Sequence, residues 1–349
     1  MSTTTNRPKG AAHLAAVRSS TSPDSTRASF DAVKKLVAGD LREVDQVIRR
    51  RLSSDVQLVN QVAEHIVGSG GKRLRPLVVV VAARACGCTE SRHTEAAAII
   101  EFIHTATLLH DDVVDSSKLR RGRDTANALY GNGASVLVGD YVYSRAFEMM
   151  VSLGNMRIMD VMASATNRIA EGEVLQLMNA HDPETTEQRY FEVIYRKTAR
   201  LFEAGTQVAA ILAGSSPDVE AAMTRYGKHL GTAFQLIDDV LDYHADREQL
   251  GKNLGVDLAE GKPTLPLIYA IRHGSEAERA MIRRAVADGD LSDLPAITAA
   301  IESTGGLAYT ARLARGEASL AIEELAGLPD SAYKQALREL ADFAVERTY

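Results

Sequence analysis

Long stretches without proline, in which apolar and polar residues are closely interspersed, dominate the chain. No proline lies between Pro76 and Pro183 or between Pro183 and Pro217, and Ala, Leu, Glu, Arg and Met fill both stretches. Such residues favour helices, and the alternating β-branched runs that indicate strands are not evident. The pattern predicts an all-α fold of about ten or more long helices joined by short loops.

The apolar run Val78 to Val81 directly follows Pro76. Because proline is tolerated in the first turn of a helix, we expect this run to open a fully buried helix. No repeat of fixed period is present, which argues against a solenoid. The composition stays uniform beyond residue 30, so residues 30–349 are predicted to form one helical domain.

Residues 1–29 are rich in Ser, Thr, Ala and Arg and poor in acidic residues. This composition favours a disordered tail over an organellar transit peptide, and the segment lacks the apolar core of a secretory signal. Elsewhere, the apolar run Leu77 to Ala83 stops at Arg84, far short of the ~18–20 residues that span a bilayer. We therefore expect no transmembrane segment.

Charge and cysteine content narrow the function classes further. The chain has 40 Lys and Arg against 46 Asp and Glu, a net charge of −6, which argues against a dedicated nucleic-acid binder. Cys86 and Cys88 have neither the number nor the spacing of a disulfide framework or a zinc site. We interpret them as plain thiols in a reducing compartment and expect a cytoplasmic protein.

A duplicated acidic motif is the strongest chemical signal. Its copies are Asp111-Asp112-Val-Val-Asp115 and Asp238-Asp239-Val-Leu-Asp242. The outer aspartates of each copy are four residues apart and share one helix face. Two charges ~4 Å apart repel by about 4 kcal/mol at an effective dielectric near 20. Carboxylates in such apolar surroundings need a counter-charge, and Mg²⁺ is a hard cation that prefers oxygen ligands and substrate phosphates.

Basic residues accompany these motifs. Lys72 and Arg75 lie in a Gly-Gly-Lys-Arg-Leu-Arg-Pro segment that leads into a helix, where backbone N–H groups also favour anions. The segment lacks the glycine spacing and the Ser or Thr of a P-loop. The other candidate cations are Arg120, Arg121, Arg123, Lys197, Lys252 and Lys262. Carboxylates for metal and cations for phosphate, on apolar helices, indicate a substrate with a diphosphate head and an apolar body.

His104 lies seven residues before Asp111, two turns away on the same helical face. A lone histidine on an apolar face is more often a core residue than a ligand. Its alignment with Leu108, Asp111 and Asp115 favours a contact with phosphate. The role of His110 stays open.

Together these motifs resemble those of the trans-polyprenyl diphosphate synthases. The resemblance runs from about residue 30 to the C-terminus. It rests on both aspartate motifs and on Gly-Gly-Lys72-Arg-Leu-Arg75-Pro, Glu101-Phe-Ile-His104, Leu119-Arg120-Arg121-Gly, Lys197-Thr198, Phe234-Gln235 and Gly251-Lys252. Glu101 to Asp115 and Ser135 to Asp140 look most like bacterial octaprenyl, nonaprenyl or decaprenyl synthases, which make quinone side chains. Asp124 departs from the proline found in many relatives, and affects none of these contacts.

The resemblance implies the type I isoprenoid synthase fold, with long helices around a central cavity, and a homodimer. It implies isopentenyl diphosphate and an allylic diphosphate, farnesyl diphosphate being the expected primer, as substrates. It also implies about three Mg²⁺ ions per active site, held by carboxylates and phosphates. Peripheral membrane association during product release is left open.

The resemblance also assigns roles to individual residues. Asp111, Asp115 and Asp238 would bind Mg²⁺, supported by Asp112, Asp239 and Asp242. The isopentenyl diphosphate would contact Lys72, Arg75, His104 and Arg121. The allylic diphosphate would contact Arg120, Lys197, Thr198, Gln235, Lys252 and Lys262. Gln235 precedes Asp238 and Asp239 by three and four residues, so spacing alone also places it on their face.

Product length is expected to depend on the residues one turn below Asp111. Ala106 and Thr107 stand there, and in relatives that stop early an aromatic residue near this point closes the pocket. Small side chains predict an open pocket and a long product, and we expect Ala106→Phe to shorten it. The helix from Asp111 back to Ala96 supplies only ~22 Å of wall, so the floor lies on other helices.

Four alternatives to a long-chain synthase make different demands on these residues. A terpene cyclase would not need Lys72, Arg75 and a second aspartate motif for a second diphosphate. A non-catalytic regulatory subunit would be expected to have lost metal ligands, yet all six aspartates are present. A short-chain farnesyl or geranylgeranyl synthase shares the chemistry and differs in product length. A purely structural helical protein would not bind Mg²⁺ and diphosphate.

Overall fold

The computed structural model describes residues 23–68, 71–120, 122–243 and 254–347. Arg121 and Lys252, both expected at the site, lie outside the described residues, as does most of the predicted tail. The first described helix already begins at Pro23, ahead of the domain boundary expected at residue 30.

The all-α prediction is confirmed. One short antiparallel hairpin, β1 (Leu119–Arg120) and β2 (Arg123–Asp124), is the exception among the described residues. The helices of the first half are α2 (Pro23–Leu36), α3 (Ala38–Leu52), α4 (Gln57–Gly68), α5 (Leu74–Ala85), α6 (Arg92–Val114), α7 (Ala126–Tyr130), α8 (Asn132–Ser152) and α9 (Met156–Asn179). Those of the second half are α10 (Glu187–Ile194), the π-helical turn η2 (Tyr195–Ala199), α11 (Arg200–Leu212), α12 (Pro217–Leu241), α14 (Val256–Ala259), α15 (Leu265–His273), α16 (Glu276–Asp288), α17 (Leu294–Thr304), α18 (Gly306–Glu324), the 3₁₀ turn η3 (Leu325–Gly327) and α19 (Ala332–Glu346).

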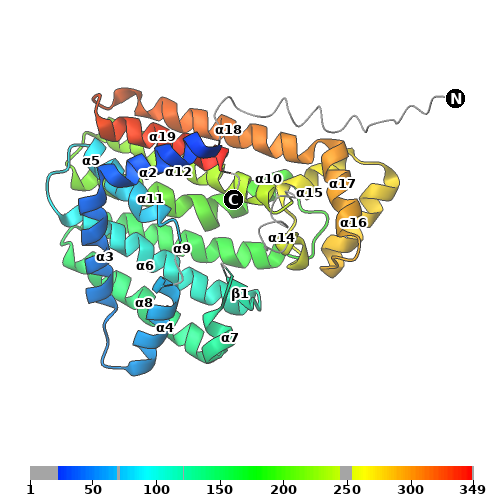
Figure 1. Cartoon of the computed structure of the whole chain (residues 1–349), viewed down its shortest axis with the longest axis horizontal. Coiled ribbons are helices and arrows are strands. Elements are labelled where there is room, and N and C mark those ends of the chain that lie inside the picture. The colour runs from blue at the N-terminus through cyan, green and yellow to red at the C-terminus, as the bar shows by residue number, and fades with distance from the viewer. Residues whose placement is uncertain (1–22, 69–70, 121, 244–253, 348–349) are drawn as a thin grey trace.

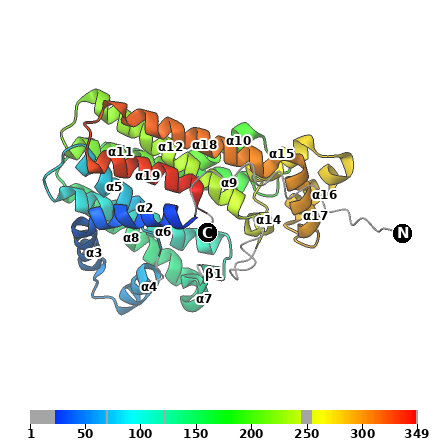
Figure 2. The ribbon, with the colours of Figure 1, turned by 45° about the horizontal axis from the view of Figure 1, so that its top comes forward.

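Long helices run roughly side by side through the body of the molecule (Figure 1). Helix α12 packs against α11 and α18, while α6 packs against α5 and α8. The shorter helices α14 to α17 gather at one end, opposite α3, and a 45° turn keeps them there (Figure 2). This end has a small apolar core of its own, which includes Leu258, Ile282 and Ile297. Among the described residues, no helix has both the length and the apolar content that crossing a membrane would require.

Two helices are buried on nearly every side, and they position the site. In α5, Val78 to Val81 are all at most 1% exposed, and Pro76 lies in the first turn, as predicted. Most residues of helix α6 are also buried as far as Leu109, while Glu101, His104 and Thr107 are half-buried. A helix that is apolar all round packs at the centre of a bundle. Helix α6 therefore carries the first acidic motif, at its C-terminal end, out of the middle of the core.

An ion-pair cluster joins α3, α5 and α6 near the start of the chain. Arg84 donates from Nη2 to Asp40 Oδ1 over 2.6 Å, and His93 Nε2 lies 3.0 Å from the same oxygen. Burial opposes the charge of Asp40, but the hydrogen bonds from Arg84 and His93 outweigh it and lower its pKa. This carboxylate fixes three helices that surround the site.

We predict that Asp40→Asn lowers the free energy of unfolding by about 1.5–3 kcal/mol at pH 7, because hydrogen bonds to a charged acceptor are lost. A lowered folded-state pKa means that the stabilisation is present at neutral pH and disappears as the pH falls below about 4. Urea unfolding of both proteins at pH 7 and under acid conditions measures this. A difference that does not shrink in acid would contradict the assignment.

Candidate active site

A large cavity opens beside the C-terminal end of α6. Its volume is about 760 Å³, and Asp111 and Asp115 both border it, as the spacing of the first motif predicts. Asp112 instead is fully buried and forms a 2.7 Å ion pair with Arg120 Nη2. Asp112 was expected to support the metal site, and Arg120 was expected to contact the allylic diphosphate. In the structure these two residues form an ion pair with each other.

Two lysines neutralise Asp111 and Asp115. Lys262 Nζ lies 2.9 Å from Asp115 Oδ2 and 2.5 Å from Glu260. Lys197 Nζ lies 3.5 Å from Asp111 Oδ2. Burial opposes the charge of Lys262, but the neighbouring carboxylates outweigh it and raise its pKa. The expected phosphate-binding lysines therefore hold the expected metal-binding carboxylates.

The second motif is divided between solvent and interior. Asp238 is 36% exposed and pairs with Arg347, whose Nη1 lies 2.9 Å from Oδ1. Asp239 is 2% exposed, and both of its oxygens accept hydrogen bonds, from Tyr190 Oη and Gln235 Nε2. Asp242 caps α12 and accepts a hydrogen bond from the backbone of Asp257. This division fits Asp238 as the metal ligand of the motif, with Asp239 and Asp242 in support.

Gln235 and Thr198, whose contact with the allylic diphosphate stays a prediction, belong to one hydrogen-bonded chain. Thr198 Oγ1 donates to Gln235 Oε1 over 2.9 Å, and Gln235 Nε2 donates to Asp239 Oδ1 over 2.8 Å. Gln235 shares the face of Asp239, as their spacing requires. The hydrogen-bonded chain connects η2 with α12 and fixes the orientation of the buried carboxylate.

Arg347, at the end of α19, was missed by sequence reasoning. It is 7% exposed, donates to the carbonyls of Ala344 and Phe234, and places its guanidinium 3.6 Å from the Phe234 ring centroid. No local motif marks a single arginine after a helix, and its pairing with Asp238 depends on how α19 packs. Its fixed geometry supplies the charge that this aspartate needs.

The predicted anion site contains cations that lie over aromatic rings. Lys72 Nζ is 5.2 Å from the ring centroid of Phe343, and the guanidinium of Arg75 is 4.8 Å from that of Phe202. Arg75 Nη1 also donates to His104 Nε2 over 3.1 Å. Three of the residues expected to hold isopentenyl diphosphate thus lie just before α5, on α5 and on α6, and the C-terminal helix α19 supplies the ring under Lys72.

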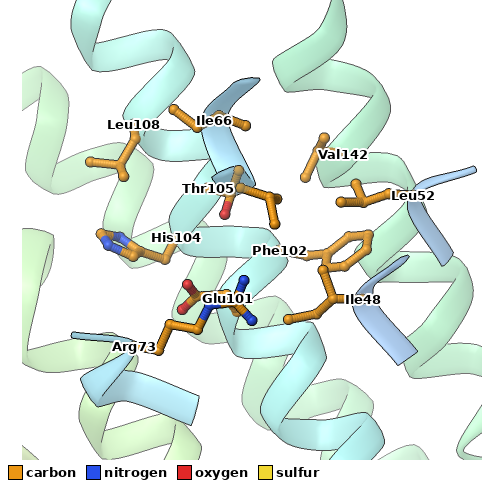
Figure 3. Close-up of a pocket in the computed structure, with 11 residues that line it drawn as sticks. Ile48, Leu52, Ile66, Arg73, Glu101, Phe102, His104, Thr105, Leu108 and Val142 are labelled. Atoms are coloured by element: carbon orange, nitrogen blue, oxygen red, sulfur yellow. The ribbon is translucent and has the colours of Figure 1, made fainter. Parts of the chain in front are cut away.

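His104 and the first motif border different cavities. His104 lines a small cavity of about 20 Å³, together with Arg73 and Glu101 (Figure 3). Its expected alignment with Asp111 does not bring the two side chains into one pocket. The phosphate contact of His104 stays a prediction.

Glu173 is a further residue that sequence reasoning missed. It borders the large cavity and pairs with Lys197 over 2.6 Å. The neighbouring Gly172 permits this ion pair by allowing the two segments to approach closely. A Cβ atom at position 172 would lie only 2.8 Å from the backbone nitrogen of Lys197. Helix α9 therefore approaches η2 closely, and π-helical turns of this kind are frequent at functional sites. In the sequence, a glycine inside a long predicted helix was a feature that could have indicated this close approach.

The chain is similar in sequence to proteins of known activity. Residues 56–303 match the family model described as polyprenyl synthetase. The octaprenyl diphosphate synthase of Escherichia coli is 54% identical over 320 residues, covering 91% of this chain and 99% of the relative.

The chain belongs to the polyprenyl synthetase family.

Two further relatives agree with this assignment. An all-trans-nonaprenyl-diphosphate synthase from Rhodobacter capsulatus is 49% identical, over 89% of this chain and 96% of its own. A crystal structure of a Caulobacter crescentus polyprenyl synthase, complexed with calcium and isoprenyl diphosphate, superimposes with a TM-score of 0.89 at 44% identity, covering 95% of this chain and 100% of that one. The resemblance inferred from the motifs is confirmed, and the chain is a trans-prenyltransferase of this family.

The available donors fit a divalent cation of the kind used in this family. Within the described residues, no three His, Cys, Asp or Glu side chains converge into a metal cage. Asp111 and Asp115, which border the cavity, come from the end of α6 and offer only hard oxygen ligands. Mg²⁺ is commonly held in this way, by one or two carboxylates with substrate phosphates completing its shell.

The two residues expected to set product length differ in position. Thr107 borders the large cavity, whereas Ala106 is fully buried and belongs to the main core. A helix turns by about 100° per residue, and here that turn directs Thr107 to the cavity and Ala106 into the core. Ile103, Tyr143, Ile169 and Ala170 continue the wall beyond Thr107. The expectation for Ala106 is therefore transferred to Thr107.

We predict that Glu173→Gln stabilises the metal-free protein more at pH 8 than at pH 5. Burial raises the pKa of Glu173 to about 7, against the opposing pull of Lys197, so ionisation of this carboxyl destabilises the fold as the pH rises. Thermal unfolding at both pH values measures the difference between variant and parent.

Glu171→Gln, which changes a carboxylate that pairs with surface arginines, serves as the matched control. Its difference from the parent should be similar at the two pH values. An equal effect of Glu173→Gln at both would contradict the raised pKa.

Proposed function

We propose that the protein is a Mg²⁺-dependent synthase that repeatedly condenses isopentenyl diphosphate onto an allylic diphosphate. The observation that carries this is the large cavity, because carboxylates and Lys262 line part of it and apolar side chains such as Ile103 and Ile169 line another part. Farnesyl diphosphate is the proposed primer. The proposed product is all-trans octaprenyl diphosphate for a quinone side chain, supported by the 54% identity to the octaprenyl enzyme.

The metal-binding carboxylates are proposed to be Asp111 and Asp115 on one side and Asp238 on the other. Bound there, about three Mg²⁺ ions would neutralise negative charge that develops on the leaving diphosphate. Lys197 and Lys262 then exchange their carboxylate partners for phosphate oxygens. Such preorganised charges stabilise the developing anion without further reorganisation.

The second substrate is positioned from the opposite side. Lys72, Arg75 and His104 would bind the diphosphate of isopentenyl diphosphate, with Arg121 from outside the described residues. Stacking over Phe343 and Phe202 restricts where these cations can point. The double bond is thereby held close to the allylic carbon, which is the main positioning task of the reaction. The departing diphosphate is the proposed acceptor of the released proton.

Product analysis tests this function. Purified protein is incubated with Mg²⁺, farnesyl diphosphate and labelled isopentenyl diphosphate, and the dephosphorylated products are separated by length. A ladder that ends at the octaprenyl species is expected, and chelation of the metal should abolish it. A ladder that ends at the farnesyl or geranylgeranyl species would favour the short-chain alternative. No incorporation by folded protein would support the regulatory-subunit alternative.

We predict that Thr107→Phe shortens the main product by several isoprene units. Thr107 borders the cavity below Asp111, and a ring there would block the path of the growing chain. The chain-length distribution of the variant, measured in the same assay, tests this. Thr107→Val preserves the side-chain volume and should leave the distribution unchanged. Unaltered products from Thr107→Phe would contradict the assignment.

A homodimer is proposed as the working unit. Apolar side chains lie exposed along α8 and α9, among them Leu137 at 70%, Leu177 at 63% and Met178 at 68%. Exposed apolar side chains that gather on neighbouring helices often mark an interface. Light scattering should give twice the chain mass, and Leu137→Arg should lower it. A monomeric mass for the parent protein would contradict this proposal.

The unbridged thiols of Cys86 and Cys88 are consistent with the cytoplasmic location proposed for the enzyme.

A further inference from the structure

A second, smaller cavity lies behind the second acidic motif. Its volume is about 140 Å³, and its walls come from the end of α9, from α10 and η2, from α12 and from the segment that leads into α15. Asn179, Thr185, Tyr190, Asp239, Asp257 and Thr264 contribute polar groups to it, and so do four side chains expected to contact the allylic diphosphate, Lys197, Thr198, Gln235 and Lys262. We call it the polar chamber. It adjoins the reaction cavity, because Gln176 and Lys262 border both.

Three buried side chains that line this chamber, Asn179, Thr185 and Thr264, have polar atoms without hydrogen-bond partners in the protein. Asn179 is 3% exposed, and neither its Oδ1 nor its Nδ2 is hydrogen-bonded. Thr185 is 5% exposed, and its Oγ1 is also unbonded. An unsatisfied buried polar group costs about 1–3 kcal/mol, so these groups require a ligand in the chamber.

The identity of that ligand follows from the amide. The side chain of Asn179 has an acceptor oxygen, Oδ1, and a donor nitrogen, Nδ2, and neither atom is hydrogen-bonded in the protein. A bare cation would satisfy the oxygen and leave the N–H groups against a positive charge. An anion would satisfy the N–H groups and leave the oxygen against a negative charge, and although Lys197 and Lys262 also line the chamber, it would face the carboxylates of Asp239 and Asp257. Water both donates and accepts, and the chamber exceeds the roughly 10–15 Å³ that one water requires.

We propose that the polar chamber is a buried water-binding site, anchored by Asn179 and Thr185, that connects the two acidic motifs. Its waters reach Asp239 on the side of the second motif and Lys262, the partner of Asp115, on the side of the first. Asn179 is thus a positioning residue, since it acts on the metal-binding carboxylates through water. Partners of this indirect kind commonly change metal affinity by about 10–100-fold when they are removed. The positioning role, though not the waters themselves, rests on the proposed function.

The first test is a crystal structure of the full chain at high resolution. Ordered waters within hydrogen-bond distance of Asn179 and Thr185 are expected in the chamber. A dry chamber, or side chains that have turned to protein partners, would overturn the proposal whatever reaction the protein catalyses.

The second test uses Asn179→Leu, which keeps the shape of the side chain and removes its polar atoms. The measurement is the Mg²⁺ concentration needed to raise the melting temperature at a fixed pyrophosphate concentration. We expect Asn179→Leu to need about tenfold more Mg²⁺. Asn179→Ser, which leaves room and partners for water, should stay near the parent value. Should Asn179→Leu fail to fold, Thr185→Val replaces it and should shift the requirement in the same direction.

An unchanged Mg²⁺ requirement in a folded Asn179→Leu or Thr185→Val variant would overturn the positioning role. If the parent protein shows no stabilisation by Mg²⁺ and pyrophosphate at all, the proposed function fails instead. The crystallographic result would still decide whether the chamber holds water.

Discussion

Charge compensation between buried carboxylates and a few fixed cations is the constraint on which the rest of this structure depends. Asp111, Asp115 and Asp238 are each paired with a basic side chain from another part of the chain, namely Lys197, Lys262 and Arg347. An unpaired charge in this setting would be strongly destabilising. The same pairs leave each partner available for exchange, because a metal ion can replace the cation and a phosphate can replace the carboxylate. The metal-free fold is thus a preassembled form of the site.

The helical scaffold makes this arrangement possible by fixing where each charged group leaves the core. Helix α6 is buried along most of its length and delivers the first motif at its C-terminal end. Gly172 permits the close approach of α9 to the π-helical turn that carries Lys197. Away from the charges, the reaction cavity continues between apolar residues such as Ile103 and Ile169. One cavity therefore offers a diphosphate end and a hydrocarbon end.

Local sequence patterns predicted most of the fold and the chemically marked residues. Proline-free stretches predicted the long helices, and the four-residue spacing of the aspartates placed Asp111 and Asp115 together on one cavity. Features set by packing escaped prediction: Arg347 pairs with Asp238 across more than a hundred residues of chain, and Glu173 meets Lys197 because of a single glycine. Ala106 was placed on the cavity wall by closeness in sequence, although helix geometry directs it into the core. Spacing identifies which residues share a face, and tertiary packing decides what that face meets.

The most direct test of the partner exchange is calorimetric titration of the full-length protein with Mg²⁺, with and without pyrophosphate. If internal cations occupy the metal-binding carboxylates, Mg²⁺ alone will bind weakly. Pyrophosphate will tighten Mg²⁺ binding by drawing Lys197 and Lys262 away, and Mg²⁺ will tighten pyrophosphate binding by the same factor. Tight Mg²⁺ binding that is unaffected by pyrophosphate would contradict the account.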